Sequence, residues 1–567
     1  MGILAGVLGV IVVASLVYPI WRLVAALFSG TDATANPLAA ALALPGLSEV
    51  LLNTLIVVAC GGLGALIMGS VLAWLNERTD AHMGWFSSVL PVLGLLVPPI
   101  ASAIGWVMLL SPRAGLINDF LRTLAGSSAS EGPLNIFSWP GLIALYAIEL
   151  TPFVYVVVAA ALRNLDPALE QASRISGAGP LMTLFRVTLP AITPSLASAA
   201  LLVVTMGLAL FSVPSVVGNS ANIPVLSTTI LDLLHNQYPP RTAEAVVLSS
   251  FMMTAIALVW MLQSRISRRA RGATVGGKGQ TSARVRLGAW KVPARIAIAL
   301  FVIVTVVLPV VALAMVSLQS FWSAHYQFDS MSFANFHQVF FGNPTTQQSL
   351  INSLLLGLLT ATIGMAIAWI LSLNNRENPS PLAALVDGVV KLPSGLSHLV
   401  VGVALLLAYA GPPFSLSGTL VILLLGYVLV YLPQGSIAAG SAVTQVHGSL
   451  VEASRMSGAS GARTLSKISL PLMLPGIASG WAMMFVFALG DLTISVLLAS
   501  TATPTAGYML LDLYNNGSFP LIAALGLTIT VVSASVVLSV LWLTRSRRKG
   551  ARRAPGGATP AAALTKV

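Results

Sequence analysis

Twelve stretches of 19 or more mostly apolar residues constrain the fold of this 567-residue chain more than any other feature. A helix needs about 20 apolar residues to cross roughly 30 Å of hydrocarbon. The stretches cover residues 3–27, 51–75, 86–110, 139–161, 191–216, 245–263, 296–318, 350–373, 382–409, 417–440, 471–499 and 520–543. Charged residues make up only 8% of the chain, against about 25% in an ordinary soluble domain. The sequence therefore predicts an all-α, polytopic membrane protein with about twelve transmembrane helices.

The placement of lysine and arginine predicts the orientation, because cytoplasmic loops carry an excess of these residues. With both termini in the cytoplasm, 24 of the 29 basic residues fall on that side, mainly in a central segment, a C-terminal tail and the loops after the fourth and tenth stretches. The basic runs flank helix ends, where they hold the orientation and meet anionic lipid. The net charge of +12 therefore does not indicate a nucleic-acid partner. We expect a multi-pass protein of a bacterial-type inner membrane.

The chain is internally duplicated. Two asparagines frame the second stretch and two frame the eighth with the same spacing, at an offset of 299 residues: Asn53 and Asn76, then Asn352 and Asn375. Asn53 and Asn352 are expected to cap the starts of the repeated helices. Residues 170–194 also align without gaps onto 451–475, with 11 of 25 positions identical. The duplication predicts four segments, which are a six-helix half at 1–263, a basic cytoplasmic linker at 264–295, a second six-helix half at 296–544 and a basic cytoplasmic tail at 545–567.

Two long loops, at 164–190 and 441–471, contain the aligned residues. Each is predicted to form a short helix, a break and a second short helix. In the first loop Asp166 and Pro167 are typical of a helix start. Glycine supplies the permissive backbone of a sharp turn, and proline is expected to mark the restart of the next membrane helix. These positions are Gly177 and Pro190 in the first loop and Gly458 and Pro471 in the second.

These loops resemble the EAA loop of ABC importer permeases, in which Glu-Ala-Ala, three residues and a glycine lead to a downstream Leu-Pro. The second loop matches closely, with Glu452, Ala453, Gly458 and Pro471. The first loop has Gln171 at the glutamate position and a glutamate one residue earlier; its matching positions are Glu170, Gln171, Ala172, Gly177 and Pro190. The resemblance implies the fold of a type I ABC importer permease. It also implies that each loop docks into a groove of a cytoplasmic ATPase and couples ATP hydrolysis to transport.

Residues 109–118, 133–138 and 161–170 look like fused permeases of the ferric-iron importer type. This resemblance implies import of a small solute by alternating access, with ferric iron as the best match. Related permeases carry thiamine, polyamines or aminoethylphosphonate. The resemblance further implies two copies of a cytoplasmic ABC ATPase, which hold ATP and magnesium, and an extracytoplasmic protein that delivers the substrate.

No enzymatic site is predicted within the chain itself. The run Gly272-Ala-Thr-Val-Gly-Gly-Lys278 begins like a phosphate-binding loop, but Gly279 replaces the Ser or Thr that ligands magnesium, and no apolar strand precedes it. The single cysteine, Cys60, and six scattered histidines do not form a metal-ligand pattern. We therefore expect a transport subunit without a nucleotide site, a bound cofactor or a metal site.

Charges within the apolar stretches are candidates for the translocation path, because each costs about 2.5–3.5 kcal/mol to insert. Asp491 is predicted to lie in the middle of the eleventh span, either lining the path or bonding a neighbouring Ser or Thr, and Glu149 is a second candidate. Asp387 and Lys391 stand four residues apart and are expected to form an ion pair. Five prolines are expected to kink or break spans beside the path: Pro98, Pro99, Pro152, Pro393 and Pro433.

An ion- or proton-driven secondary transporter remains the alternative class, since it can also have twelve helices in two repeats. Such a transporter would need ionisable relays within the membrane and no long loops after the fourth and tenth spans. Ionisable residues are few within these spans, whereas both loops are long. The sequence therefore favours the ATP-driven importer.

Overall fold

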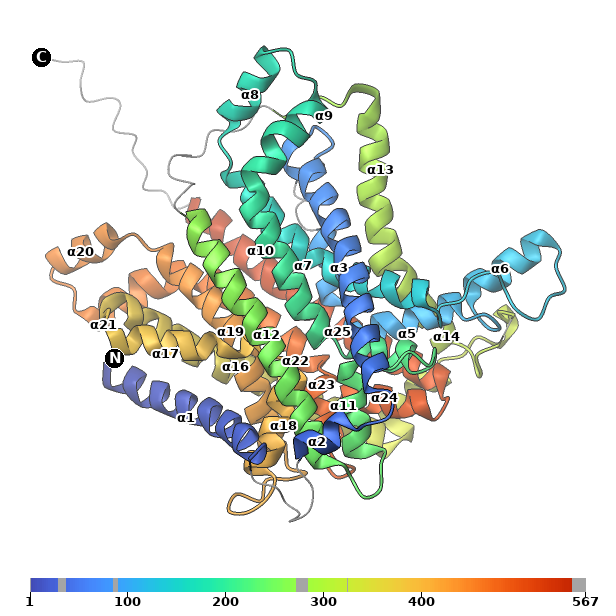
Figure 1. Cartoon of the computed structure of the whole chain (residues 1–567). Coiled ribbons are helices and arrows are strands. Elements are labelled where there is room, and N and C mark those ends of the chain that lie inside the picture. Colours follow the sequence, from blue (N-terminus) through green and yellow to red (C-terminus); the bar gives the residue numbers. More distant parts are fainter. Residues whose placement is uncertain (1, 29–36, 85–89, 272–283, 324, 553–567) are drawn as a thin grey trace, which may run out of the picture.

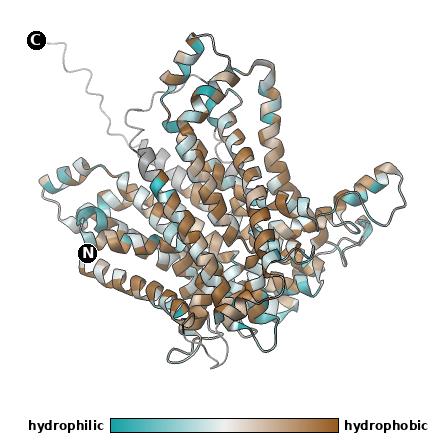
Figure 2. Cartoon of the chain, in the orientation of Figure 1, coloured by the Kyte–Doolittle hydropathy of each residue, from teal (hydrophilic) through white to brown (hydrophobic). Residues whose placement is uncertain are grey.

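The computed structural model describes residues 2–28, 37–84, 90–271, 284–323 and 325–552. Within these ranges the chain forms helices and one isolated β-bridge. Ten helices in this part of the chain are long and apolar enough to cross a membrane, and one bent helix pair brings the number to eleven. They form a single bundle whose helices are hydrophobic over most of their length (Figures 1 and 2). The predicted all-α membrane fold is confirmed.

The two halves repeat one arrangement of helices. The long helices of the first half are α1 (Gly2–Ala26), α3 (Leu47–Arg78), α7 (Trp139–Asn164), α10 (Leu189–Ala209) and α12 (Thr242–Arg271). Those of the second half are α13 (Lys291–Val302) with α14 (Leu308–Ser317), then α16 (Pro344–Glu377), α19 (Leu420–Thr444), α22 (Leu470–Leu489) and α25 (Phe519–Arg552). α3 packs against α7 and α10, and α16 packs in the same way against α19 and α22.

The first span of each half packs against the other half. α1 lies on α16, α17 (Pro381–Lys391) and α18 (His398–Tyr409) of the second half, as Figure 1 shows. In return, α14 packs against α5 (Pro99–Leu110) of the first half. The largest hydrophobic cluster contains buried residues of both halves. The halves therefore share one core and form one body.

Two of the twelve predicted spans are broken rather than straight. In the predicted span 382–409, α17 and α18 are bent by 110° around a short 3₁₀ turn that contains Pro393. In the predicted span 86–110, the 3₁₀ segment Leu90–Leu96 precedes α5, with Pro98 and Pro99 at the junction; residues 85–89 lie outside the described ranges. Prolines lie at both breaks, and proline lacks the N–H that a continuing helix needs. α7 and α19 continue through Pro152 and Pro433 without a break.

The predicted spans 191–216 and 471–499 are shorter than expected. α10 ends at Ala209 and α22 ends at Leu489. Each then leads through a short helical segment, η3 (Pro214–Gly218) or α23 (Thr493–Leu498), to a further short helix, α11 (Leu226–His235) or α24 (Ala506–Asn515). The chain is therefore interrupted after the fifth span of both repeats, next to Asp491 in the second.

The repeated asparagines Asn53 and Asn352 tie these segments to the long helices. Their prediction as helix caps was wrong, because both lie more than a turn inside α3 and α16. In each half the asparagine amide donates to a proline carbonyl, and the next hydroxyl accepts a backbone N–H: Asn53 to Pro224 (3.1 Å) and Leu226 to Thr54 (2.8 Å), then Asn352 to Pro504 (2.8 Å) and Ala506 to Ser353 (2.7 Å). The same pair of bonds in both halves holds the N-termini of α11 and α24 in place.

Candidate functional site

The loop after α7 folds as two short helices joined by a sharp turn. α8 (Pro167–Ile175) begins at Asp166, whose Oδ1 accepts a hydrogen bond from the Ala168 N–H at 2.9 Å. The chain turns at Gly177, where φ is 86°, and continues into α9 (Pro180–Thr183). This left-handed conformation is open to glycine without a steric penalty. The predicted helix, turn and second helix are confirmed for this loop.

The loop after α19 has the same geometry. α20 (Gly448–Met456) and α21 (Gly461–Thr464) flank Gly458, where φ is 76°. In both loops a serine hydroxyl lies within hydrogen-bonding distance of a threonine hydroxyl on the second short helix: Ser173 and Thr183 at 3.1 Å, Ser454 and Thr464 at 2.9 Å. Both loops project from the bundle as separate knobs (Figure 1). We call residues 167–183 the first knob and residues 448–464 the second knob.

Arg78, at the end of α3, holds the first knob against the bundle. One of its terminal amino groups lies 3.2 Å from Oε2 of Glu170, and the two side chains are only 3% and 8% exposed. The other amino group donates to the carbonyls of Leu162 at 2.5 Å and Leu165 at 3.0 Å, where α7 ends. Glu170 also accepts a hydrogen bond from the Thr188 hydroxyl at 2.7 Å. This network joins α3, α7, α8 and the segment leading into α10.

In the second knob, no acidic side chain among the described residues pairs with the anchoring arginine. Arg376, near the end of α16, donates to the carbonyls of Val443 and Val446, which are equivalent to the two leucines at the end of α7. Val451 occupies the position equivalent to Glu170, and Glu452 beside it is exposed. The second knob therefore presents a carboxylate to solvent, whereas the first uses its carboxylate for internal anchoring.

The other predicted coupling residues lie on the knob surfaces. Gln171 and Ala172 are exposed on α8, and Ala453 is exposed on α20. Each knob also presents one large apolar side chain at the end of its first helix, and sequence reasoning did not single out these two residues. Ile175 is 88% exposed and the equivalent Met456 is 89% exposed. On the first knob Leu181 and Met182 are exposed as well, 65% and 50%, and exposed apolar side chains that lie together are typical of a contact surface for another protein.

The sequence predicted that Pro190 and Pro471 mark the restart of a membrane helix after a break. In the structure no break directly precedes either proline. A π-helical turn, Leu184–Thr188 or Leu465–Ser469, precedes each proline, and the backbone runs on in helical conformation into α10 or α22. A π-helical turn before the proline lets the helix continue, although proline cannot donate the usual backbone hydrogen bond. Each knob is therefore connected to a membrane span by continuous helix.

The C-terminal part of the predicted linker 264–295 is anchored beside the first knob. The Val285 N–H donates to the Arg78 carbonyl at 2.8 Å, and the Leu287 N–H donates to Oδ1 of Asp80 at 3.0 Å. This backbone donor and the nearby Lys291 lower the pKa of Asp80. The glycine-rich run at 272–279 lies outside the described residues. The end of α3 therefore supports both the first knob and the start of the second half.

Asp491 does not lie in the middle of a span but in the break between α22 and α23. Its Oδ1 accepts the N–H groups of Ile494 at 2.8 Å and Ser495 at 3.2 Å, so the carboxylate caps α23. Its Oδ2 accepts a hydrogen bond from the Tyr431 hydroxyl at 2.6 Å and lies 3.9 Å from Nδ1 of His398. A break in the helix leaves N–H groups that need an acceptor, which explains why an acid is buried here.

Glu149 and the Asp387–Lys391 pair lie apart from Asp491. Glu149, on α7, is hydrogen-bonded to Ser102 of α5. Asp387 and Lys391 form the predicted ion pair within α17, with Oδ2 and Nζ 2.6 Å apart. Among the described residues, no three His, Cys, Asp or Glu side chains form a group that could hold a metal ion. Glu149 and Asp491, the two candidate acids of the path, thus lie in different halves of the chain and have different hydrogen-bond partners.

Replacing Asp491 separates its capping role from a role of its charge. Asp491→Leu introduces the residue of the first repeat, Leu210, and removes the acceptor of three buried donors. We expect it to lower the free energy of unfolding by about 1–3 kcal/mol for each donor left without a partner. Asp491→Asn keeps an oxygen that can accept the N–H groups and should retain most of the thermal stability in detergent.

Uptake by the stable asparagine variant then decides what the charge does. Normal uptake would assign Asp491 to helix capping, whereas lost uptake with unchanged thermal stability would assign it to the translocation path. Equal melting temperatures for the leucine variant and the unchanged protein would contradict the capping role.

The anchoring residues Arg78 and Arg376 and the Tyr431 partner of Asp491 were not anticipated from the sequence. A lone arginine at the end of an apolar stretch in each half was a usable signal for the first two. The Ser–Thr pairs within the knobs had a stronger sequence signal, because the serine and the threonine are each the same in both repeats of the gapless alignment. Nothing in the local sequence around Tyr431 indicates its contact with Asp491, which is 60 residues away.

Two repeated helical halves in one membrane bundle, each with a matching knob, have the architecture of a multi-pass membrane permease. The family model for the binding-protein-dependent transport system inner membrane component matches residues 61–272 and 374–552, and the chain belongs to this family. It is the permease of a binding-protein-dependent ABC importer and a multi-pass inner-membrane protein. The predicted resemblance to fused permeases of this kind is confirmed.

Several characterised relatives are similar over long stretches. The ferric transport system permease protein FbpB of Actinobacillus pleuropneumoniae is 25% identical over 512 residues, which cover 88% of this chain and 72% of the relative. The Fe(3+)-transport system permease protein FbpB 2 of Haemophilus influenzae is 23% identical, covering 81% of this chain and 83% of the relative. The spermidine/putrescine transport system permease protein PotB of Escherichia coli is 24% identical, covering 38% of this chain and 78% of the relative.

One solved structure is similar over about half of the chain. It is a bacterial alginate ABC transporter in complex with an alginate pentasaccharide-bound periplasmic protein. The matched permease chain is 21% identical, with a TM-score of 0.38, and the match covers 46% of this chain and 91% of that chain.

Proposed function

We propose that this permease imports its solute with energy from two copies of a separate cytoplasmic ABC ATPase, one docked on each knob. The single observation that carries the proposal is the matched pair of knobs, each with an exposed apolar tip, a left-handed glycine and a continuous helical connection to a membrane span. ATP and magnesium bind to the ATPase, and this chain contributes no nucleotide site or catalytic residue. Both termini and both knobs lie in the cytoplasm.

The transport cycle is alternating access. Closure of the ATPase dimer on ATP moves the knobs, and the π-turn helices carry this movement into α10 and α22. A broken helix follows each of these spans, so a shift of either span displaces the interrupted segments at the centre of the bundle. Asp491 and Glu149 are the candidate polar groups of the path. An extracytoplasmic binding protein delivers the solute to the opposite face.

Ferric iron is the proposed substrate, supported by the names of the long relatives from Actinobacillus and Haemophilus. A polyamine is the second candidate, supported by the shorter match to the spermidine/putrescine permease. Thiamine and aminoethylphosphonate remain further alternatives. Specificity in such a system rests largely on the binding protein.

The substrate test compares uptake in cells with and without this chain. We expect deletion to abolish uptake of radiolabelled ferric iron under iron limitation and to leave spermidine and thiamine uptake unchanged. Loss of spermidine uptake with normal iron uptake would replace iron with a polyamine.

Replacing the exposed apolar side chain at each knob tip with a charged one tests the docking surface. Ile175→Glu and Met456→Glu place a charge on side chains that are almost fully exposed, so folding should be unaffected. We expect each variant to lower the amount of ATPase that co-purifies with the permease and to lower uptake. Thr444→Glu, on the exposed surface of α19 before the second knob, is the control.

The energy source separates this proposal from an ion-driven transporter. Uptake that continues in membrane vesicles supplied with ATP after the proton gradient is dissipated supports the proposal. Uptake that collapses with the gradient, in a permease that purifies without an ATPase, would establish the alternative.

A further inference from the structure

The short helix α6 (Leu116–Ala125) carries an apolar face that the transport machinery described above does not use. It lies in the segment between α5 and α7 and projects sideways from the bundle in Figure 1. Ile117, Phe120, Leu121 and Leu124 recur at spacings of three and four residues and therefore share one helix face. Phe120 is 65% exposed and Leu124 is 75% exposed. Side chains of this size are seldom left in water together on one helix face.

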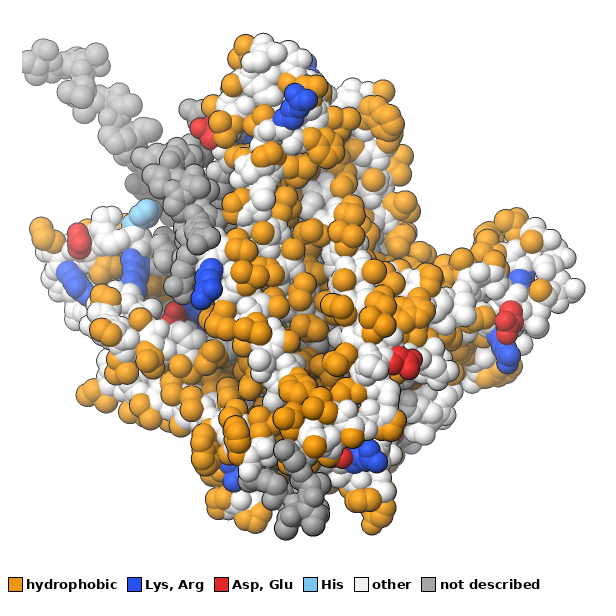
Figure 3. Space-filling view, in the orientation of Figure 1, with side chains coloured by type: hydrophobic (Ala, Val, Ile, Leu, Met, Phe, Trp, Pro, Cys, Tyr) orange, Lys and Arg blue, Asp and Glu red, His pale blue; other side chains and the backbone are white. Residues whose placement is uncertain are grey.

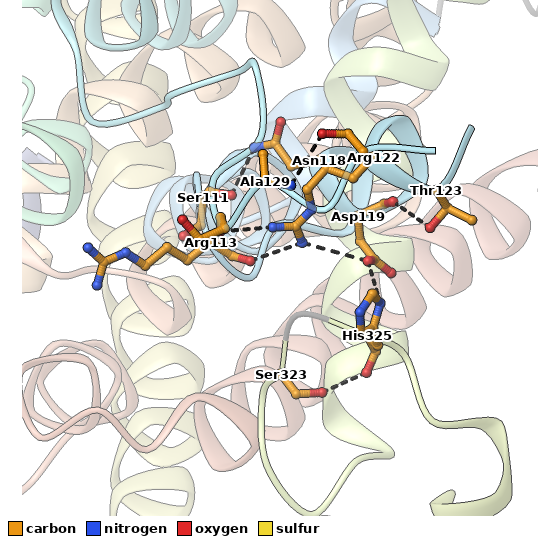
Figure 4. Close-up of polar contacts among 11 residues, drawn as sticks. Ser111, Arg113, Asn118, Asp119, Arg122, Thr123, Ala129, Ser323 and His325 are labelled. Atoms are coloured by element: carbon orange, nitrogen blue, oxygen red, sulfur yellow. Dashed lines mark hydrogen bonds and ion pairs between the residues drawn. The ribbon is translucent and has the colours of Figure 1, made fainter. Parts of the chain in front are cut away.

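The opposite, polar face of α6 is fully engaged in holding the helix in place. Asn118 donates to the carbonyls of Ser111 at 2.8 Å and Leu134 at 2.7 Å. Arg122 donates to the carbonyls of Ser130 at 3.0 Å and Arg113 at 3.1 Å, as Figure 4 shows for part of this network. These contacts fix the rotation of α6 about its own axis. The apolar face therefore points away from the loop that the polar face holds.

The anchoring contacts also tie α6 to the ends of two apolar helices. α5 ends at Leu110 and α7 begins at Trp139, and the Asn118 amide reaches back to the carbonyl that follows the end of α5. Asp119 joins the helix to the second half, because its Oδ1 lies 2.7 Å from Nδ1 of His325, in the segment between α14 and α16 (Figure 4). Ser111 directly follows the apolar helix α5, and the His325 segment follows α14, which ends the span Gly288–Ser317.

The surroundings of α6 match a lipid–water boundary. The His325 segment exposes several large aromatic side chains of its own, among them Phe328, Phe333 and Phe341. The exposed ion pair of Arg113 and Glu131 lies in the loop on the polar side of α6. In Figure 3 hydrophobic side chains gather along the upper edge of the projecting arm, and acidic and basic side chains lie below them. An apolar face on one side and charges on the other is the arrangement of a helix lying in a membrane interface.

We propose that α6 is an interfacial helix that lies in the plane of the bilayer, with its apolar face in the boundary between lipid headgroups and acyl chains. The occupant of this face is lipid, because the polar face ties α6 to the ends of the apolar helices α5 and α14 while Phe120 and Leu124 stay exposed. The helix braces the segment before α7 against the membrane and, through Asp119 and His325, links the two halves. This role depends neither on the substrate nor on which side of the membrane α6 occupies.

Spin labels can test this placement, because Cys60 is the single cysteine of the chain. In a Cys60→Ser background, Phe120→Cys and Leu124→Cys report on the apolar face, and Thr123→Cys reports on the exposed polar side as a matched control. The labelled full-length permease is reconstituted into nanodiscs of phosphatidylethanolamine and phosphatidylglycerol. Collisions with oxygen, which partitions into lipid, are compared with collisions with a water-soluble nickel chelate.

We expect oxygen collisions to exceed nickel collisions at positions 120 and 124 and the reverse at position 123. Nickel access at positions 120 and 124 equal to that at position 123 would place the face in water and overturn the proposal. Labels that are open to nickel in nanodiscs but become shielded when purified binding protein is added would make the face a protein-docking surface, and this result would also overturn it.

Discussion

Gly458→Asp is expected to abolish solute uptake while leaving the permease inserted and folded in the membrane. Gly458 has a φ of 76°, so a β-carbon introduces strain that glycine avoids. The site has open space around it, because no atom lies within 4 Å of a β-carbon built there. The strain therefore falls on the turn between α20 and α21 rather than on the core. A displaced turn moves Met456 and Glu452, the exposed groups of the second knob.

The readouts for this variant are uptake, co-purification of the ATPase and the amount of permease in the membrane. Gly448→Asp is the matched control, since it places the same charge at the first residue of α20 without a positive φ. An acidic side chain near a helix N-terminus is also electrostatically favourable. Unchanged uptake by Gly458→Asp would refute a coupling role for the second knob.

Arg78→Ala is expected to give the largest loss of stability among single substitutions at the knobs. It removes the partner of Glu170 in an ion pair that is almost fully buried, and it removes two hydrogen bonds to the end of α7. Breaking a buried pair by deleting one partner costs about 3–5 kcal/mol, because the other charge stays buried without compensation. We expect a clear fall in melting temperature in detergent and loss of ATPase binding at the first knob.

Arg163→Ala provides the comparison for this substitution. Arg163 pairs with Glu77 at 3.0 Å close to the same helix ends, but its side chain is 57% exposed. An exposed ion pair contributes only about 0–1 kcal/mol. Glu170→Val, which installs the residue of the second repeat, should be milder than Arg78→Ala because the arginine keeps its carbonyl partners. Equal melting temperatures for Arg78→Ala and Arg163→Ala would contradict the anchoring role.

The class of fold and the two knobs could be predicted from the sequence because their signals are local. Apolar length reports membrane spans directly, and the identical Gly177 and Gly458 report the two turns. The gapless repeat between 170–194 and 451–475 also predicted that both knobs would have one geometry. The ion pair between Asp387 and Lys391 followed from helical spacing alone.

The features that were mispredicted depend on contacts between distant residues. From the sequence, Asp491 was interpreted as a charge within a membrane span. It caps α23 because the helix breaks after Leu489. Asn53 reads as a helix start, yet its partner is the carbonyl of Pro224, 171 residues away. The π-turn before Pro190 recurs before Pro471, and neither was predicted from the sequence. The breaks in the spans could not be predicted from proline alone either, since Pro98 and Pro393 interrupt helices whereas Pro152 and Pro433 do not.

Cross-linking from the knob tips to the ATPase is the most direct measurement of the central claim. Ile175→Cys and Met456→Cys, each in a Cys60→Ser background, are treated in native membranes with a short thiol-reactive cross-linker. We predict that both positions form a covalent product with the same ATPase polypeptide, and that ATP binding changes the yield at both. Thiols at either position that react instead with an impermeant reagent added outside intact cells would contradict the claim.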